Sequence, residues 1–385
     1  MRSLIVFLGL LFTTACSLFA APPVRYLDQV FDSLSVTSNI LYGSNVNYDG
    51  KLDSLKLDLY QPFADTAKAR PLMLFFYGGG FAVGDKTSDD IVRLCRTFAE
   101  KGYVTAAPNY RLNPTLSNGQ TKVTQYTATL RGVQDAKAAV RFLRSKKANY
   151  KIDDTRIMMG GTSAGAVISL GCAYWDENEI PSYIDTASVG GIEGTSGTPG
   201  VSSVIDGVIN CWGCVIDSTY LNNNRVPVIS FAGTADPTVP YDVGYALGNP
   251  VLTCVGSACI NRVLTRLGVK SVLKPFIGMG HGMATNDPRF DTILTMSSQF
   301  AYGILFGATA VAQSYDKSTI EQDHRPAIGS IALGRASAGT GPVLFRQSTA
   351  YSLNGRVVRA PEDAKTRSVS RSMASGIYVF QPALK

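Results

Sequence analysis

The chain has 385 residues, of which 45% are hydrophobic and 17% are charged. This length is enough for one large α/β domain of roughly 250–300 residues and a smaller unit, and the composition excludes a disordered chain. The formal net charge of +7 is modest, and the body of the chain has no dense run of lysine and arginine. Nucleic acid is therefore not expected as a partner.

The first 20 residues have the pattern of an export signal. Arg2 precedes an apolar run at residues 4–12, and small residues follow up to residue 21. This run is too short for an anchored membrane helix, so we expect a cleaved signal peptide over residues 1–20 and a secreted or cell-surface protein. Lipid attachment at Cys16 is the alternative. No later segment is apolar enough to span a membrane.

Cysteine usage fits an exported chain. Loss of Cys16 with the signal would leave six of the seven cysteines, an even number that favours disulfides. The segment "CVGSAC" places Cys254 and Cys259 on one short loop, and we expect a disulfide between them. The segment "CWGC" at residues 211–214 has neither a histidine nor a second CxxC pair nearby, so a metal or redox role is not expected. Pairing among the other four cysteines stays open.

Strands and helices are expected to alternate along residues 21–312. Strands are predicted at residues 51–62, 70–77, 103–112 and 155–161, amphipathic helices at 89–102 and 127–146, and further strands at 204–210, 226–233 and 272–278. The continuous apolar run "RPLMLFF" is typical of a strand buried on both faces of a parallel sheet. The alternation predicts a doubly wound, mostly parallel α/β sheet.

Two segments differ in composition from this pattern. Residues 191–203 are rich in Gly, Ser and Thr, and we expect them to form a loop over or beside the functional site. Beyond residue 312 long apolar runs become rare, which predicts a linker at 313–340 and a small β module at 341–385.

The pentapeptide "GTSAG" at residues 161–165 has the pattern G-x-S-x-G between a predicted strand and a predicted helix. In this setting the chain turns sharply at the serine, and a side chain at Gly161 or Gly165 would collide with the neighbouring strand or helix. We interpret Ser163 as a nucleophile. The alternative is a glycine-rich turn with an incidental serine.

A serine nucleophile needs a base, and the chain has two histidines. His281 follows a predicted strand in the glycine-flanked segment "GMGHGM", whereas His324 lies in the predicted linker. We therefore expect His281 to be the base.

The base in turn needs a carboxylate to orient it. Asp236 follows a predicted strand and fits the chain order Ser, Asp, His, and Asp206 and Asp242 are its rivals. The mechanism also needs N–H donors for an oxyanion, which we expect from Gly79, Gly80 and Ala164. The alternative for the glycines is a tight turn that ends a strand.

Together these segments resemble the α/β-hydrolase superfamily over about residues 45–305. The likeness rests on "YGGGF", "NYRL", "DAKAAVRFLR", "TRIMMGGTSAGA", "GTADPTVPYD" and "GHGM". More closely, the chain resembles feruloyl esterases, acetylxylan esterases and hormone-sensitive-lipase-like esterases. The resemblance implies that Ser163 is the nucleophile, Asp236 the acid and His281 the base. One departure is Tyr77, where many relatives have a histidine before the glycines.

The resemblance implies a secreted serine esterase that needs no metal ion or cofactor. Its expected substrates are feruloyl or acetyl esters of plant cell-wall polysaccharide. The C-terminal segments "TAYSLNGRVVRA" and "SGIYVFQ" resemble a bacterial type IX secretion sorting domain, which implies secretion machinery as a partner. The alternatives are a short-chain carboxylesterase or lipase, a serine peptidase of the same fold, and a non-catalytic carbohydrate-binding protein.

Overall fold

The computed structural model describes residues 23–307, 348–351, 357–358 and 379–382. The predicted signal peptide, the linker at 313–340 and His324 lie outside the described residues, as does most of the predicted module at 341–385. The three short strands of that module form an antiparallel sheet in the order β12–β11–β13.

The strands are β1 (Leu34–Val46), β2 (Leu52–Pro62), β3 (Arg70–Phe76), β4 (Val104–Pro108), β5 (Ile152–Thr162), β6 (Gly207–Cys211), β7 (Val228–Gly233), β8 (Val243–Tyr245), β9 (Thr253–Val255), β10 (Ser271–Phe276), β11 (Ser348–Tyr351), β12 (Val357–Val358) and β13 (Val379–Pro382). The α-helices are α1 (Asp89–Glu100), α2 (Lys122–Ser145), α3 (Lys147–Tyr150), α4 (Ala164–Tyr174), α5 (Thr186–Val189), α6 (Ser257–Arg266) and α7 (Pro288–Phe306). Short 3-10 helices are η1 (Pro114–Asn118), η2 (Glu177–Glu179), η3 (Ser218–Asn222) and η4 (Ala246–Gly248).

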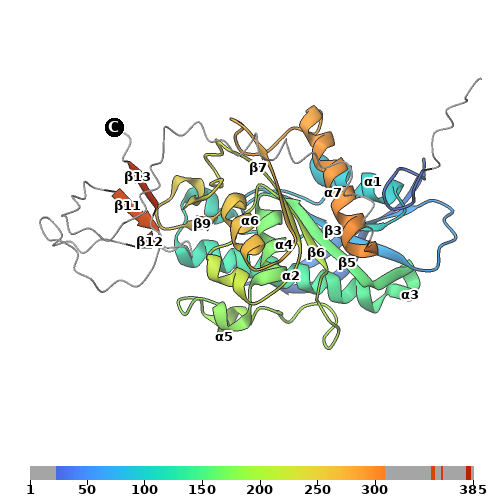
Figure 1. Cartoon of the computed structure of the whole chain (residues 1–385). Helices are drawn as coiled ribbons and strands as arrows, with labels where there is room; N and C mark the ends of the chain where they lie inside the picture. The colour runs from blue at the N-terminus through green and yellow to red at the C-terminus, as the bar shows by residue number, and fades with distance from the viewer. Residues whose placement is uncertain (1–22, 308–347, 352–356, 359–378, 383–385) are drawn as a thin grey trace, which may run out of the picture.

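An eight-stranded sheet in the order β1-β2-β4-β3-β5-β6-β7-β10 forms the centre of the molecule (Figure 1). Strand β2 is antiparallel to both of its neighbours, and the pairs from β4 to β10 are parallel. Helices α1 and α7 cover one face, and α2, α4 and α6 the other. The predicted doubly wound, mostly parallel α/β sheet is confirmed.

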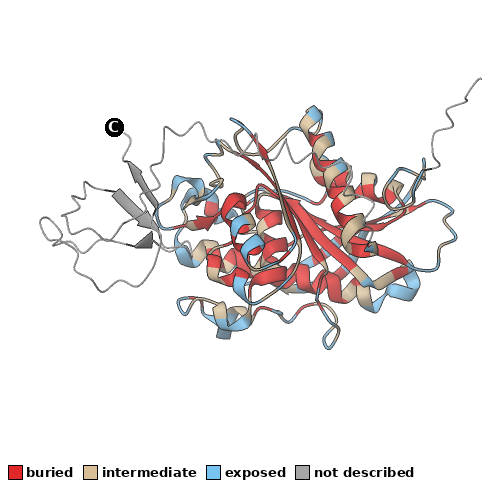
Figure 2. Cartoon of the chain, viewed as in Figure 1, coloured by how far each residue is buried: buried red, intermediate tan, exposed pale blue. Residues whose placement is uncertain are grey.

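Burial explains why the central strands are apolar along most of their length. All seven residues of β3 are buried, as expected for a strand that is covered by helices on both faces. Figure 2 shows the same burial along the middle of the sheet, while the outer surfaces of the helices are exposed. Helix α1 buries one stripe, Ile91, Leu94, Cys95 and Phe98, at the spacing from which it was predicted.

Other elements begin or end differently from the prediction. Helix α2 begins five residues before the predicted start because Thr121 caps it: the Thr121 hydroxyl accepts a hydrogen bond from the Thr124 N–H, and the Thr124 hydroxyl accepts one from the Thr121 N–H. Strand β1 was not predicted. It lies at the sheet edge, and most of its side chains are half-buried or exposed, so its sequence lacks a clean apolar pattern.

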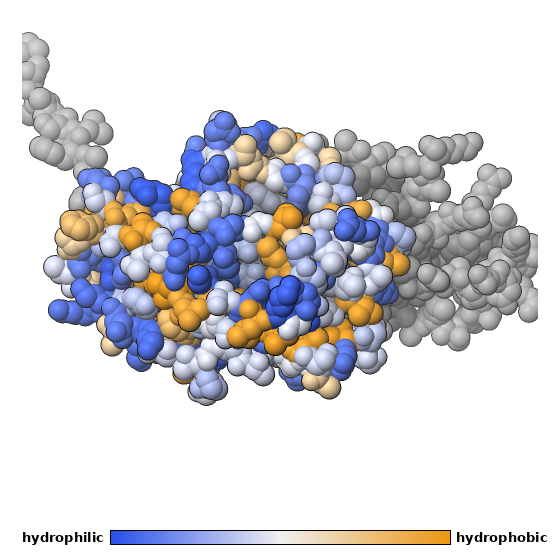
Figure 3. Space-filling model, turned by 180° about the vertical axis from the view of Figure 1, so that it is seen from behind, coloured by the Kyte–Doolittle hydropathy of each residue, from blue (hydrophilic) through white to orange (hydrophobic). Residues whose placement is uncertain are grey.

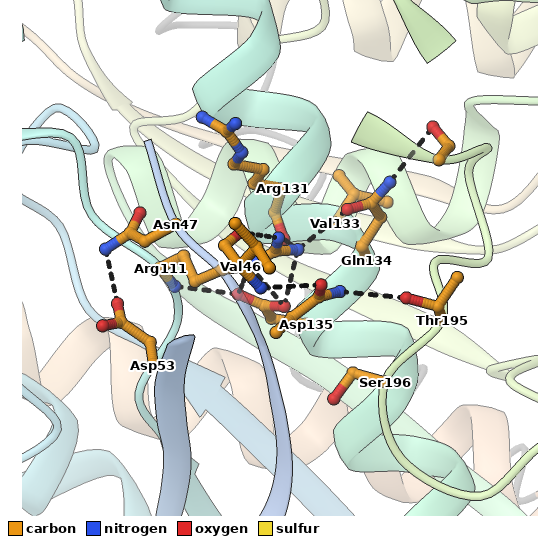
Figure 4. Close-up of polar contacts among 12 residues, drawn as sticks. Val46, Asn47, Asp53, Arg111, Arg131, Val133, Gln134, Asp135, Thr195 and Ser196 are labelled. Carbon is orange, nitrogen blue, oxygen red and sulfur yellow. Dashed lines mark hydrogen bonds and ion pairs between the residues drawn. The ribbon is translucent and has the colours of Figure 1, made fainter. Parts of the chain in front are cut away.

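A buried ion pair connects the N-terminal strands to the helical layer (Figure 4). The Arg111 guanidinium donates to both carboxylate oxygens of Asp135 at 2.9–3.0 Å, and also to the Val46 carbonyl and the Gln134 side chain. Burial raises the pKa of Asp135 above its ordinary value, against the opposing effect of Arg111. The Gln134 amide in turn donates to the Gly191 carbonyl. This network therefore holds β1, the loop after β4, α2 and the loop after α5 together.

The loop at residues 191–203 does not lie at the functional site, so that prediction was wrong. Its Glu193 pairs with Lys137 and Arg141 on α2, and its Ser196 carbonyl accepts from Arg141. These cationic side chains lie along α2, one and two turns beyond Gln134, and they hold the polar loop there.

The surface described by the structure is mixed in polarity. Figure 3 shows apolar patches separated by hydrophilic ones on the back of the molecule. Four of the exposed large apolar side chains, Val36, Leu41, Val46 and Leu52, lie on β1 and β2 at the sheet edge. Among the described residues, no helix has both the length and the apolar character that a membrane span requires.

Asp135→Asn is expected to destabilise the fold by roughly 3–5 kcal/mol, because it leaves the buried Arg111 charge without a counter-charge. Chemical denaturation of both proteins would measure the change. Asp154→Asn is the control: its partner Lys147 is half exposed, so we expect less than about 1 kcal/mol. Equal losses in the two variants would contradict the role of the buried pair.

Candidate active site

The candidate site lies where the connections of the sheet reverse direction. The chain passes from β3 through α1 to β4 on one side, then returns through α2 to β5 on the other side of β3. The loops after β3 and β5 therefore diverge and leave a crevice between them, which is where open α/β sheets bind ligands. Gly78–Gly80 follow β3, and Ser163 follows β5.

Ser163 is held in a strained turn between β5 and α4. Its φ of 51° and ψ of −118° are uncommon for a residue with a side chain. The turn is tight because α4 starts against the end of β3: a Cβ at Gly165 would lie 1.9 Å from the Phe76 carbonyl oxygen, and one at Gly161 would lie 2.4 Å from the same atom. The two glycines therefore allow the sharp bend at Ser163.

The structure brings Ser163, His281 and Asp236 together from three loops. His281 Nε2 lies 2.8 Å from Ser163 Oγ, and His281 Nδ1 lies 2.8 Å from Asp236 Oδ2. With the ring proton on Nδ1, the imidazole donates to Asp236 and accepts from the Ser163 hydroxyl. The His281 side chain is 21% exposed and Asp236 only 1%. The arrangement can remove a proton from Ser163 and stabilise the imidazolium that results.

The loop after β7 holds the Asp236 carboxylate in place. Its Oδ1 accepts hydrogen bonds from the backbone N–H groups of Thr238 and Val239, which leaves Oδ2 for His281. The His281 loop crosses β7 closely, because a Cβ at Gly233 would lie 2.3 Å from the Met279 carbonyl oxygen.

The rival carboxylates lie elsewhere. Asp206 accepts a hydrogen bond from the Ile157 N–H at 2.7 Å, beside the N-terminal part of β6. Asp242 forms an exposed ion pair with Arg262. Neither contacts His281 among the hydrogen bonds of the described residues.

The glycine turn after β3 faces Ser163 across the crevice. A Cβ at Gly78 would lie 3.1 Å from Ser163 Cβ, so the two loops are in close contact. Gly79 and Gly80 have φ of 112° and 61°, in the region that favours glycine. Their N–H groups and that of Ala164, the first residue of α4, have no backbone acceptor within the described part of the chain.

Tyr77, which directly precedes the glycine turn, supports it by packing against Tyr110. Its ring stacks on Tyr110 with centroids 4.4 Å apart, and the Tyr110 hydroxyl donates to the Tyr77 carbonyl at 3.0 Å. Burial raises the pKa of both phenols, so both stay protonated and can donate. The tyrosine pair thus holds the glycine turn in place.

A cavity of about 440 Å³ opens beside Ser163 and His281. Its apolar wall comes from several elements and includes Phe81, Tyr126, Val167, Trp212, Val239, Leu247, Leu252 and Met283. Polar groups are few and include Asp90, whose carboxylate accepts a hydrogen bond from the Thr162 hydroxyl at 2.7 Å. Such a cavity can hold an apolar group next to the serine.

Trp212 is a site residue that the sequence analysis did not select. It follows β6 directly, is buried, and has a φ of 46°, a strained value for a tryptophan. The next residue must be glycine, because a Cβ at Gly213 would lie 2.5 Å from the Ala166 Cβ. Its position at the carboxyl end of a predicted strand was the available signal, as it was for Ser163 and Asp236.

The predicted disulfide between Cys254 and Cys259 is not present in the structure, where both cysteines are free thiols. The supposed loop ends at residue 256, and Cys259 lies on α6 with its sulfur beside Arg262. Cys254 lies on β9 instead, where burial and the neighbouring Cys214 thiol raise its pKa. Among the described residues, no three His, Cys, Asp or Glu side chains gather as a metal site would require.

Comparison with known sequences gives partial matches. Residues 57–213 match the family model BD-FAE. Gut esterase 1 of Caenorhabditis elegans is 29% identical over 122 residues, 31% of this chain and 20% of that protein. A probable isoprenylcysteine alpha-carbonyl methylesterase of Oryza sativa subsp. japonica is 29% identical over 156 residues, 40% of this chain and 32% of that protein. The chain thus spans less than a third of either curated relative.

The fold matches a solved structure over a larger share. Thermogutta terrifontis esterase 2 phosphorylated by paraoxon aligns with a TM-score of 0.51 and 23% identity, over 74% of this chain and 98% of that chain. At this identity the likeness shows the shared fold.

Gly165→Ala is expected to lower the free energy of unfolding by about 3 kcal/mol or more, because the new methyl group meets the backbone of β3. Thermal unfolding followed by circular dichroism, together with the soluble yield, would measure this loss. Gly303→Ala on α7 is the control: its Cβ would meet only the flexible end of Lys270 at 3.3 Å, and helix propensity favours alanine. A Gly165→Ala protein as stable as the control would refute the close contact.

Proposed function

This chain has the α/β-hydrolase fold, and from that premise we propose that it is a secreted serine esterase acting on feruloyl or acetyl esters of plant cell-wall polysaccharide. The observation that carries the proposal is the contact of His281 with both Ser163 and Asp236 at 2.8 Å, beside a largely apolar cavity. The BD-FAE match and the two curated esterases support ester hydrolysis as the reaction class.

In the first half of the proposed reaction, Ser163 Oγ attacks the ester carbonyl carbon while His281 Nε2 takes the hydroxyl proton. Asp236 keeps the ring proton on Nδ1 and stabilises the imidazolium. The N–H groups of Gly79, Gly80 and Ala164 donate to the oxyanion of the tetrahedral intermediate. His281 then protonates the leaving alcohol, and the acyl group remains on Ser163.

In the second half, water takes the place of the alcohol. His281 removes its proton as it attacks the acyl carbon, and the same N–H groups stabilise the second oxyanion. Collapse of this intermediate returns the proton to Ser163 and releases the carboxylic acid. These steps are acid–base and nucleophilic chemistry carried by the side chains and backbone of the chain.

The cavity supports a particular size of acyl group. A volume of about 440 Å³ exceeds what an acetyl group fills, and aromatic residues such as Tyr126 and Trp212 contribute to its wall. A planar aromatic acid would bury more apolar surface there than an acetyl group would. Between the two proposed substrates, the cavity therefore favours the feruloyl ester.

Export is part of the same proposal. The signal pattern over residues 1–20 and the tail resembling a sorting domain support action outside the cell. A polymeric substrate such as a cell-wall polysaccharide requires that location.

A release assay on the purified protein would test the reaction and the substrate together. We expect more ferulate from methyl ferulate than acetate from acetylated xylan, both measured by chromatography. Ser163→Ala should release product more slowly by roughly 10⁴–10⁶-fold, because the attacking oxygen is lost. A variant that keeps a tenth of the activity would refute the proposed nucleophile. Cleavage of p-nitrophenyl acetate without either product would refute the cell-wall substrate alone.

Asp236→Asn is expected to lower kcat by roughly 10⁴-fold, because the amide no longer stabilises the imidazolium or fixes the His281 tautomer. Asp242→Asn is the matched control, since its partner is an exposed arginine. Steady-state kinetics on p-nitrophenyl acetate would compare the two. Similar kcat values for both variants would exclude Asp236 as the acid.

A further inference from the structure

Two buried cysteines meet in the wall of the cavity. Cys214 follows Trp212 on the loop after β6, and Cys254 lies on β9. Burial and the nearby Cys214 thiol raise the pKa of Cys254, and both cysteines border the cavity beside Ser163. Their exposed fractions are 8% and 1%.

The backbone holds these two segments side by side. Val215 and Val255 form an antiparallel bridge in which each N–H donates to the other's carbonyl, at 3.0 and 2.9 Å. Cys214 and Cys254 each precede a bridge residue, so their side chains leave the bridge on the same face. Because the two cysteines are diagonal neighbours across this bridge, the backbone pairing places their side chains near each other on one face.

We propose that Cys214 and Cys254 form a disulfide that ties the Trp212 loop to β9 across the cavity wall. The loop that it closes contains β7 and Asp236, together with the cavity residues Leu247 and Leu252. Asp236 is also close enough to Cys254 to affect its ionisation.

The bond forms by thiol–disulfide exchange with a small disulfide such as glutathione disulfide. The Cys214 thiolate, which faces the cavity, attacks one sulfur of that oxidant, whose S–S bond breaks and releases one thiolate. Cys254 then loses its proton and attacks the sulfur of Cys214, which releases the second thiolate. Two protein thiols give up two electrons and two protons in all, and one glutathione disulfide becomes two glutathione thiols.

The disulfide has a structural consequence for the proposed site. It restricts the unfolded chain over the closed loop, which raises the stability of the folded state. It also keeps the Trp212 loop and β9, which both form part of the cavity wall, from moving apart. Reduction is therefore expected to lower the thermal midpoint of the protein.

Peptide mapping tests the linkage without relying on catalysis. Trypsin releases residues 157–225, which include Cys214, and residues 226–262, which include Cys254. After treatment with glutathione disulfide and alkylation, we expect mass spectrometry of the full chain to find these two peptides joined, and separate after reduction. Recovery of both peptides separate and alkylated from the oxidised protein would overturn the proposal.

Variants identify which sulfurs take part, since each peptide holds further cysteines. Cys214→Ala and Cys254→Ala should each abolish the joined peptide, whereas the controls Cys211→Ala and Cys259→Ala should retain it. Loss of the joined peptide only in a control would assign the bond elsewhere and overturn the proposal. Should an alanine variant fail to fold, the mapping of the wild-type protein still decides whether the peptides are joined.

The thermal midpoint gives a second readout. The oxidised wild-type protein should unfold roughly 4–10 °C above the reduced protein, and Cys214→Ala should show no such difference. The same midpoint in both states of the wild-type protein would count against the bond. Because neither readout measures ester hydrolysis, an inactive protein with the joined peptides would refute the proposed function and leave the disulfide standing.

Discussion

The close backbone contact between the end of β3 and the start of α4 is the constraint on which the site depends. Gly161 and Gly165 permit it, since any side chain there would overlap the Phe76 carbonyl. With this contact in place, Ser163 is pushed out of the turn into the crevice, and the glycine turn after β3 lies against it. Strain at Ser163 is thus maintained by the packing of three elements around it.

Two groups of polar contacts in this fold have different roles. On the α2 side, the Arg111–Asp135 pair and its hydrogen bonds are buried and join segments that are far apart in the sequence. At the crevice, Asp236 is buried but His281 keeps an exposed edge toward the cavity. One set of charges stabilises the fold, and the other leaves a reactive group accessible to a substrate.

The wall of the cavity depends on a segment that is far from Ser163 in the sequence. Residues between Asp236 and His281 form β8, β9 and α6, and several of them border the cavity. The bridge between Val215 and Val255 joins this segment to the Trp212 loop. The shape of the cavity is therefore set by pairing between two irregular segments, and the proposed disulfide would act at that junction.

The sequence by itself determined the sheet type and the candidate triad, because these rest on local patterns. The all-apolar run of β3, the glycines around Ser163 and the presence of only two histidines each carry their meaning within a few residues. Helix α7 could also have been found, since Asp287 and Pro288 are a typical helix start.

Only the tertiary structure decided the position of loop 191–203, the placement of Cys254 near Cys214 and the role of Trp212 in the cavity wall. The first depends on α2 cations that lie more than 50 residues away along the chain, and the second on pairing across 40 residues. Such contacts depend on how segments that are distant in the sequence pack together in the folded chain, so local sequence patterns do not contain them.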